Sequence, residues 1–103
     1  MEPIEVDVVR GMKAIEKLKV ALLKAEWQLH DGALSGSDTD MLEALADLVG
    51  LSYLLTRRLG FDFARLDRML LQRLESWRRE DAMELENHWG DLSLLLSYLA
   101  PDE

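Results

Sequence analysis

Three carboxylates share one predicted helical face near the middle of the chain. Asp40, Glu43 and Asp47 follow one another at spacings of three and four residues, which places them within about 60° of each other on a helix. Carboxylate oxygens are ligands that Mg²⁺ prefers, and Mg²⁺ in proteins also binds substrate phosphates. The stripe therefore indicates a magnesium site that would neutralise the phosphates of a bound ligand.

Glu26 is a fourth candidate metal ligand because of the residues around it. It follows Leu22 by four residues and precedes Leu29 by three, so it falls near the apolar stripe of an earlier predicted helix. A buried carboxylate needs a charged partner or a metal ion. If the two helices pack antiparallel, Glu26 is expected to face the three carboxylates of the later helix.

These charged residues also have ordinary structural interpretations. An acidic helix face is usually solvated, Asp40 can belong to an N-cap, and Glu43 can stabilise the first turn. Arg58 continues the carboxylate stripe and Arg73 lies near the apolar face of a third predicted helix, so both are candidate phosphate ligands. Alternatively, Arg58 stabilises a helix C-terminus and Arg73 packs its aliphatic stem on the core.

Aromatic and histidine residues carry weaker signals. The three tryptophans are candidates either to stack on a nucleobase or to anchor the core; they are Trp27, Trp77 and Trp89. His30 and His88 lack the spacing of a zinc site.

Four helices are predicted to position these side chains, because apolar residues recur every three or four positions and no stretch alternates as a strand would. They cover residues 6–30, 37–59, 63–77 and 91–99, with a further helical turn within 82–89 and a loop over 30–37. Ser37 with Asp40 resembles a capping box. Asp62 and Asp91 are predicted N-caps, and Gly60 is the predicted C′ residue of the second helix.

The composition bounds the class of protein. A chain of 103 residues is predicted to form a single all-α domain over residues 1–103. A net charge of −8 argues against binding to DNA or RNA polymers. The absence of cysteine excludes a disulfide scaffold and a cysteine-ligated zinc site. The sequence shows neither a secretory signal nor an apolar run of the ~20 residues that span a bilayer, so a cytoplasmic protein without membrane contact is expected.

Runs of adjacent leucines predict a second packing surface. Such runs cannot point to one side of a helix; they are Leu22–Leu23, Leu54–Leu55, Leu70–Leu71 and Leu94–Leu96. Helices that are apolar over more than one face need a further partner, and small cores gain stability by association. A homodimer or larger homo-oligomer is therefore predicted to complete the bundle, with a monomer whose apolar stripes are merely wide as the alternative.

Two segments resemble the MazG-type nucleotide pyrophosphohydrolases. Residues 41–60 (MLEALADLVGLSYLLTRRLG) look like the second helix of that superfamily, and residues 84–93 (ELENHWGDLS) are similar to the end of its short bacterial MazG-like group. The resemblance covers about residues 15–99. It implies an all-α fold assembled as a tight dimer or tetramer. It also implies hydrolysis of a nucleoside or deoxynucleoside triphosphate to the monophosphate and pyrophosphate with Mg²⁺ or Mn²⁺.

The metal motif departs from the family pattern of an ExxE pair on one helix and an ExxD pair on the next. The second pair corresponds to Ala44 and Asp47, and the first at best to Leu23 and Glu26, so one acid of each pair is present. The neighbouring acids of the stripe are candidates to rebuild a shifted site. The alternatives are an inactive helical module that senses nucleotides or binds a protein, and a small acidic regulatory partner. No catalytic side chain is assigned.

Overall fold

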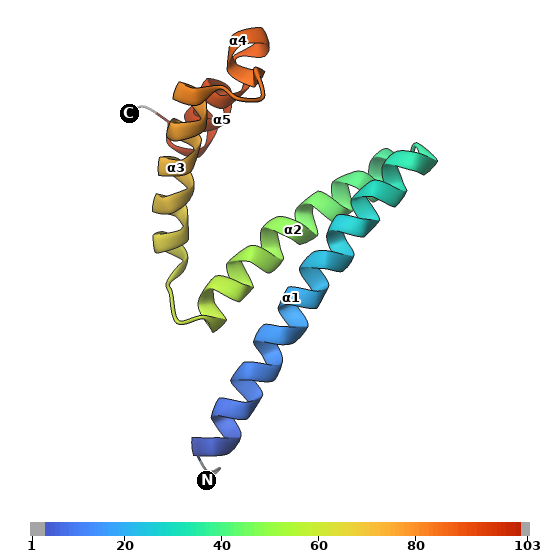
Figure 1. Ribbon diagram of the computed structural model, residues 1–103, viewed down its shortest axis with the longest axis vertical. Helices are drawn as coiled ribbons and strands as arrows, with labels where there is room; N and C mark the ends of the chain where they lie inside the picture. Colours follow the sequence, from blue (N-terminus) through green and yellow to red (C-terminus); the bar gives the residue numbers. More distant parts are fainter. Residues whose placement is uncertain (1–3, 102–103) are drawn as a thin grey trace. The chain divides into compact units, whose positions relative to one another are not determined.

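The computed structural model describes residues 4–101, and these residues form five helices and no strand. The helices are α1 (Ile4–Ser35), α2 (Asp38–Arg58), α3 (Phe63–Glu80), α4 (Leu85–Trp89) and α5 (Asp91–Leu99) (Figure 1). The predicted all-α fold is confirmed. The chain divides into two compact units, Met1–Phe63 and Ala64–Glu103. Within the described part of the chain, no helix is both long enough and apolar enough to cross a membrane.

The first unit is a hairpin of α1 and α2, which lie side by side from the turn that joins them (Figure 1). Gly36 ends α1 with a φ of +72°, a conformation that suits glycine because it has no Cβ. Ser37 immediately caps α2, and its side-chain oxygen accepts a hydrogen bond from the Asp40 backbone N–H at 3.2 Å. The predicted N-cap is thus confirmed. The predicted loop over 30–37 is wrong for residues 30–35, which continue α1, because the chain leaves the helical conformation only at Gly36.

Small residues let the two helices approach closely next to this turn. Ala25 and Ala44 are each only 2% exposed, and Gly32 is buried as well. A Cβ added at Gly32 would lie 3.2 Å from the Cβ of Asp40 and 3.2 Å from both the Cγ and the backbone nitrogen of Met41. Two of these three neighbours are fixed close to the backbone of α2, so a methyl group at position 32 would push the helices apart.

A pair of glycine substitutions tests this close approach. Alanine is favoured over glycine in a helix interior by about 0.5–1 kcal/mol, and a Cβ at Gly50 would have nothing within 4 Å. Gly50→Ala is therefore expected to raise the free energy of unfolding by about that amount. Gly32→Ala is expected to lower it by about 1–3 kcal/mol, the usual effect of overpacking. Urea unfolding of both variants measures the difference, and equal stabilisation would contradict the close approach.

The C-terminus of α2 ends in a Schellman motif. The N–H of Gly60 donates to the carbonyl of Arg57 at 3.0 Å, and the N–H of Phe61 donates to the carbonyl of Thr56 at 3.1 Å. Gly60 has a φ of +98°, which confirms it as the residue that ends the helix. The ring of Phe63 then packs edge-to-face against Tyr53, with ring centres 5.8 Å apart.

The second unit holds α3, α4 and α5 around the buried side chains of Leu74 and Leu92. The extra helical turn predicted within 82–89 is confirmed by α4. Two carboxylates satisfy the exposed N–H groups where its short helices begin. Asp81 accepts hydrogen bonds from the backbone N–H groups of Glu86 at 3.0 Å and Asn87 at 2.8 Å, at the start of α4.

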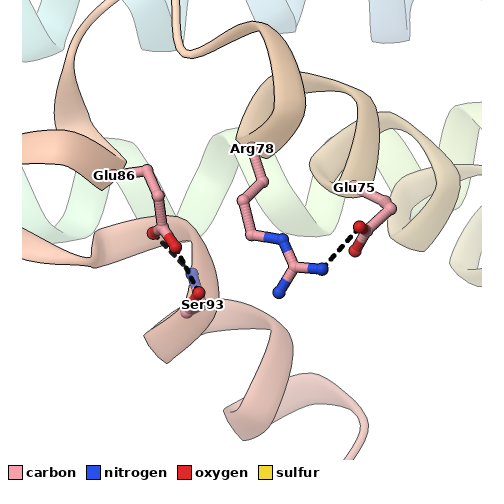
Figure 2. A network of polar contacts seen from close by, with 4 residues as sticks. All are labelled: Glu75, Arg78, Glu86 and Ser93. Atoms are coloured by element: carbon pink, nitrogen blue, oxygen red, sulfur yellow. Dashed lines mark hydrogen bonds and ion pairs between the residues drawn. The ribbon is translucent and has the colours of Figure 1, made fainter.

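The carboxylate of Glu86 then accepts hydrogen bonds from Ser93, at the start of α5. The Ser93 backbone N–H donates at 3.0 Å, and the Ser93 hydroxyl donates as well (Figure 2). The prediction that Asp91 caps α5 is wrong. The residue before the helix is Gly90, with a φ of +67°, and Asp91 is already the first helical residue. Glu86 therefore supplies from α4 the hydrogen bond that a local cap would make.

The hydrogen bond from the Ser93 hydroxyl lowers the pKa of Glu86 below its ordinary value of 4.5, and the Ser93 N–H and the charge of Arg78 add to this. Because the pKa is lower in the folded state, ionised Glu86 stabilises this unit fully above about pH 4.5. That contribution is lost as the pH falls through the lowered pKa. Thermal unfolding between pH 3 and 7 is expected to show Glu86→Gln less stable than the parent at neutral pH, with the gap closing in acid.

Ser93→Ala is the companion variant, because it removes the strongest cause of the lowered pKa. Its acid transition is expected to move up towards pH 4.5, the ordinary value of the Glu86 carboxyl. A stability gap for Glu86→Gln that stays constant from neutral to acid pH would show that the carboxylate does not act as a cap.

Candidate functional site: an acidic groove on the helical hairpin

A groove beside the turn of the α1–α2 hairpin gathers four carboxylates. It has a volume of about 280 Å³ and is lined by Trp27, Gln28, Asp31, Asp40, Glu43, Ala44 and Asp47. One carboxylate, Asp31, comes from α1, and the other three come from a single face of α2. All four acidic residues are exposed. The structure therefore brings together the predicted stripe of Asp40, Glu43 and Asp47, and adds an acid from the facing helix.

The expected facing of Glu26 towards this stripe is not found. Glu26 is exposed and does not line the groove. The residues that α1 packs against α2 are centred on the buried Ala25 and Gly32. Glu26 is one position from Ala25, which turns it about 100° around the helix, onto the flank away from the groove. Its role as a metal ligand stays a prediction that this arrangement does not favour.

Asp31 lies in the groove where Glu26 is expected, and the sequence pattern does not indicate it. It follows Gln28 by three residues and Trp27 by four, so all three share one side of α1 once the helix is continuous there. The sequence pattern predicts a loop over residues 30–37, and in a loop residue spacing does not define a shared face. One sequence feature could have placed Asp31 in the helix, namely the N-cap serine at position 37. If α1 continues to Ser35, this cap leaves only Gly36 and Ser37 to connect the two helices.

The two candidate arginines lie outside the groove lining. Arg58 ends α2, eleven residues after Asp47, or about 16 Å further along the helix axis. Arg73 belongs to the second unit, where its guanidinium carbon lies 5.9 Å from the centre of the Trp77 ring. This is the geometry of a cation–π contact, which gives Arg73 a structural partner. Phosphate binding by either arginine stays a prediction.

The groove offers the type of ligand that Mg²⁺ prefers, but it does not provide a complete coordination shell of protein ligands. Its ionisable groups are all carboxylates, and hard oxygen ligands are those that Mg²⁺ prefers. Among residues 4–101, however, no three His, Cys, Asp or Glu side chains lie close enough to hold a metal ion together. Proteins commonly bind Mg²⁺ through one or two carboxylates, with phosphates and waters completing the shell. The groove therefore fits an ion that arrives with a phosphate ligand.

Comparison with known proteins identifies a family. Residues 8–92 match the model of the MazG-like family. No curated protein and no solved structure matches the chain.

Proposed function

The chain belongs to the MazG-like family, and from this premise we propose that it hydrolyses a nucleoside or deoxynucleoside triphosphate to the monophosphate and pyrophosphate, with Mg²⁺ or Mn²⁺. The observation that carries the proposal is the gathering of four carboxylates from two helices around one open groove. A triphosphate entering that groove would be repelled without a divalent cation. The cation and the nucleotide are therefore expected to bind together.

The chain's own residues have two tasks in this reaction. Asp47 and Asp31, from facing helices, are the residues that would hold the metal, with Glu43 and Asp40 beside them. When bound, the metal would neutralise phosphate charge and polarise the bond that breaks. A carboxylate that is not a ligand can accept a hydrogen bond from the attacking water and orient it towards the phosphorus. The bond between the α and β phosphates breaks, and pyrophosphate leaves.

The direct test is incubation of the full chain with each nucleoside and deoxynucleoside triphosphate, with Mg²⁺ or Mn²⁺, followed by chromatography of the products. Monophosphate and pyrophosphate are expected in equal amounts, and both should vanish when the metal is chelated. Titration calorimetry adds a second readout. Mg²⁺ alone is expected to release no binding heat, whereas Mg²⁺ with a non-hydrolysable triphosphate analogue is expected to bind.

A second candidate function, nucleotide sensing or protein binding without catalysis, is favoured by one observation. Ala44 stands at the motif position of a glutamate and is only 2% exposed, packed between α1 and α2. The helix interface at position 44 therefore lacks the carboxylate that a glutamate would supply. Binding of the analogue without any product would support a sensor. Neither binding nor product, with a stable complex in a pull-down, would support a protein-binding module.

The proposal includes assembly into a homodimer or tetramer in the cytoplasm. The buried hydrophobic residues among those described are Ala25, Ala44, Leu74 and Leu92, whereas many large apolar side chains are exposed. Two of these four buried residues are alanines, so each unit has a small core. Association of apolar faces is the usual way for such small cores to gain stability.

A further inference from the structure

The side of α1 that faces away from α2 is apolar along most of its length. Its residues and their exposed fractions are Val9 48%, Met12 63%, Val20 62%, Leu23 68%, Trp27 63% and Leu34 89%. Leu23 and Trp27 are each two positions from the buried Ala25, which turns them about 160° away from it. We call these six residues the outer face of α1. Trp27 belongs both to the outer face and to the lining of the acidic groove.

The N-terminal part of α1 also lacks a partner from α2. The first helix has 32 residues and the second has 21, so α1 extends about 16 Å beyond α2. Figure 1 shows this extension at the blue end of the chain. It carries a shallow apolar depression lined by Val9, Met12, Lys13, Glu16 and Lys17. Neither Lys13 nor Lys17 has an ion-pair partner among the described residues.

The outer face is self-complementary in an antiparallel arrangement. A two-fold axis between positions 21 and 22 of α1 places Val9 opposite Leu34 and Val20 opposite Leu23. Such an isologous contact buries these four residues against apolar residues of the other copy. The same axis places Met12 opposite Asp31 and Trp27 opposite Glu16. The parallel arrangement would instead set Glu16 beside Glu16 of the other copy, near the middle of the face, where like charges repel.

Charge favours the same arrangement. Lys13 and Lys17 lie on the flank of α1 that also carries Asp31, since they precede it by eighteen and fourteen residues, or about five and four helical turns. A two-fold axis perpendicular to both helices keeps a flank on the same side of the pair. Lys13 of one copy then lies within one turn of the position opposite Asp31 of the other, on a flank that also carries Lys24.

We propose that a second copy of this chain packs its α1 antiparallel on the outer face, so that the partner's Lys13 and Lys17 border the acidic groove. Each groove then has carboxylates from one copy and ammonium groups from the other. The ammonium groups reduce the repulsion among the carboxylates in the empty groove. When a nucleotide is bound, they contact the phosphate oxygens that the metal leaves free; this last role rests on the proposed function.

Disulfide cross-linking tests the arrangement directly, because the chain has no native cysteine. Val9 and Leu34 lie about 37 Å apart within one α1, so they cannot join within a chain. The double variant Val9→Cys/Leu34→Cys is expected to form covalent oligomers under mild oxidation, and so is a mixture of the two single variants. Neither single variant should cross-link alone. Cross-linking of Val9→Cys with itself, or no cross-linking of the double variant, would overturn the proposal.

A charge on the outer face tests the assembly in solution. Leu23→Glu is expected to give a smaller oligomer by analytical ultracentrifugation, with helix content unchanged, because Leu23 is 68% exposed within the chain. The matched control is Leu42→Glu, since Leu42 is 69% exposed on α2. If Leu42→Glu gives a smaller oligomer and Leu23→Glu does not, the proposal is wrong.

Substrate kinetics test the contribution of the partner's lysine. Lys13→Ala is expected to raise KM for the triphosphate about tenfold with kcat kept and the oligomer intact, since a charged hydrogen bond contributes about 1.5 kcal/mol. An unchanged KM in an active enzyme would overturn this contribution. The cross-links and the oligomer masses are measured without nucleotide. If the parent chain is inactive, the proposed function is wrong, and the antiparallel pair is still decided by the cross-links and masses.

Discussion

Asp47→Asn is expected to lower kcat/KM for triphosphate hydrolysis on the order of 100-fold, the usual loss when a group that stabilises developing charge is removed. The substitution keeps the shape of the side chain and deletes its charge. Asp47 lines the groove and is the α2 acid that the sequence resemblance predicts as a metal ligand. It is exposed, so the fold should be unaffected. Release of monophosphate at several Mg²⁺ concentrations measures the effect, and part of the loss should be recovered at high Mg²⁺.

The control for this loss is Asp38→Asn, which makes the same chemical change in the first turn of the same helix. Asp38 is exposed and lies outside the groove lining. It is expected to keep its activity, with a small decrease in stability of about 0.3–1 kcal/mol from the lost interaction with the helix dipole. Equal losses for Asp38→Asn and Asp47→Asn would show that net charge matters and the groove does not.

Comparison of Asp31→Asn with Glu26→Gln decides which acid of α1 serves the site. The structure places Asp31 in the groove lining and Glu26 outside it, so the loss of activity is expected to be greater for Asp31→Asn. The reverse order would favour the residue that the sequence pattern indicated and would reject the groove as the metal site.

The α2 half of the site could be predicted from the sequence, and the α1 half could not. Spacings of three and four fix a shared face within one helix without any knowledge of tertiary structure, so Asp40, Glu43 and Asp47 were found. The facing acid depends on where α1 ends and on which side packs against α2. Gly32 favours a loop by its residue type, yet it is helical. Because it has no side chain, Asp40 and Met41 of α2 can approach it closely.

Helix ends show the same division between local and distant information. Ser37 and Gly60 act on residues next to them, and both predictions were confirmed. The start of α5 is stabilised by Glu86, seven residues before Ser93. No local rule connects those two positions, because the contact depends on the direction in which α5 leaves Gly90, a residue with a φ of +67°.

Leu74→Ala is expected to destabilise the second unit by about 2–5 kcal/mol, the range found for buried leucines. Leu74 is 2% exposed, and Leu92 is the other buried hydrophobic residue among those described in this unit. A unit of this size has little stability to lose. The variant should therefore lose cooperative unfolding of α3–α5, as seen in a broadened thermal transition by circular dichroism.

Met69→Ala is the matched control for Leu74→Ala, since Met69 lies on the same helix and is 53% exposed. Its effect is expected to stay within about 0.5 kcal/mol, as for most surface substitutions. If the two variants unfold at the same temperature, Leu74 is not the centre of this core.

The two-residue connection of Gly36 and Ser37 has a consequence for the order of folding. Gly32 contacts Asp40 and Met41, which follow it by only eight and nine residues. Closing so short a loop loses little chain entropy, and proteins dominated by local contacts fold rapidly. The two helices are therefore expected to pair first near the turn and then towards their far ends. The acidic groove should form early, and the N-terminal extension of α1 should form last. Residues near the turn should then slow folding when mutated, whereas residues at the far ends should mainly speed unfolding.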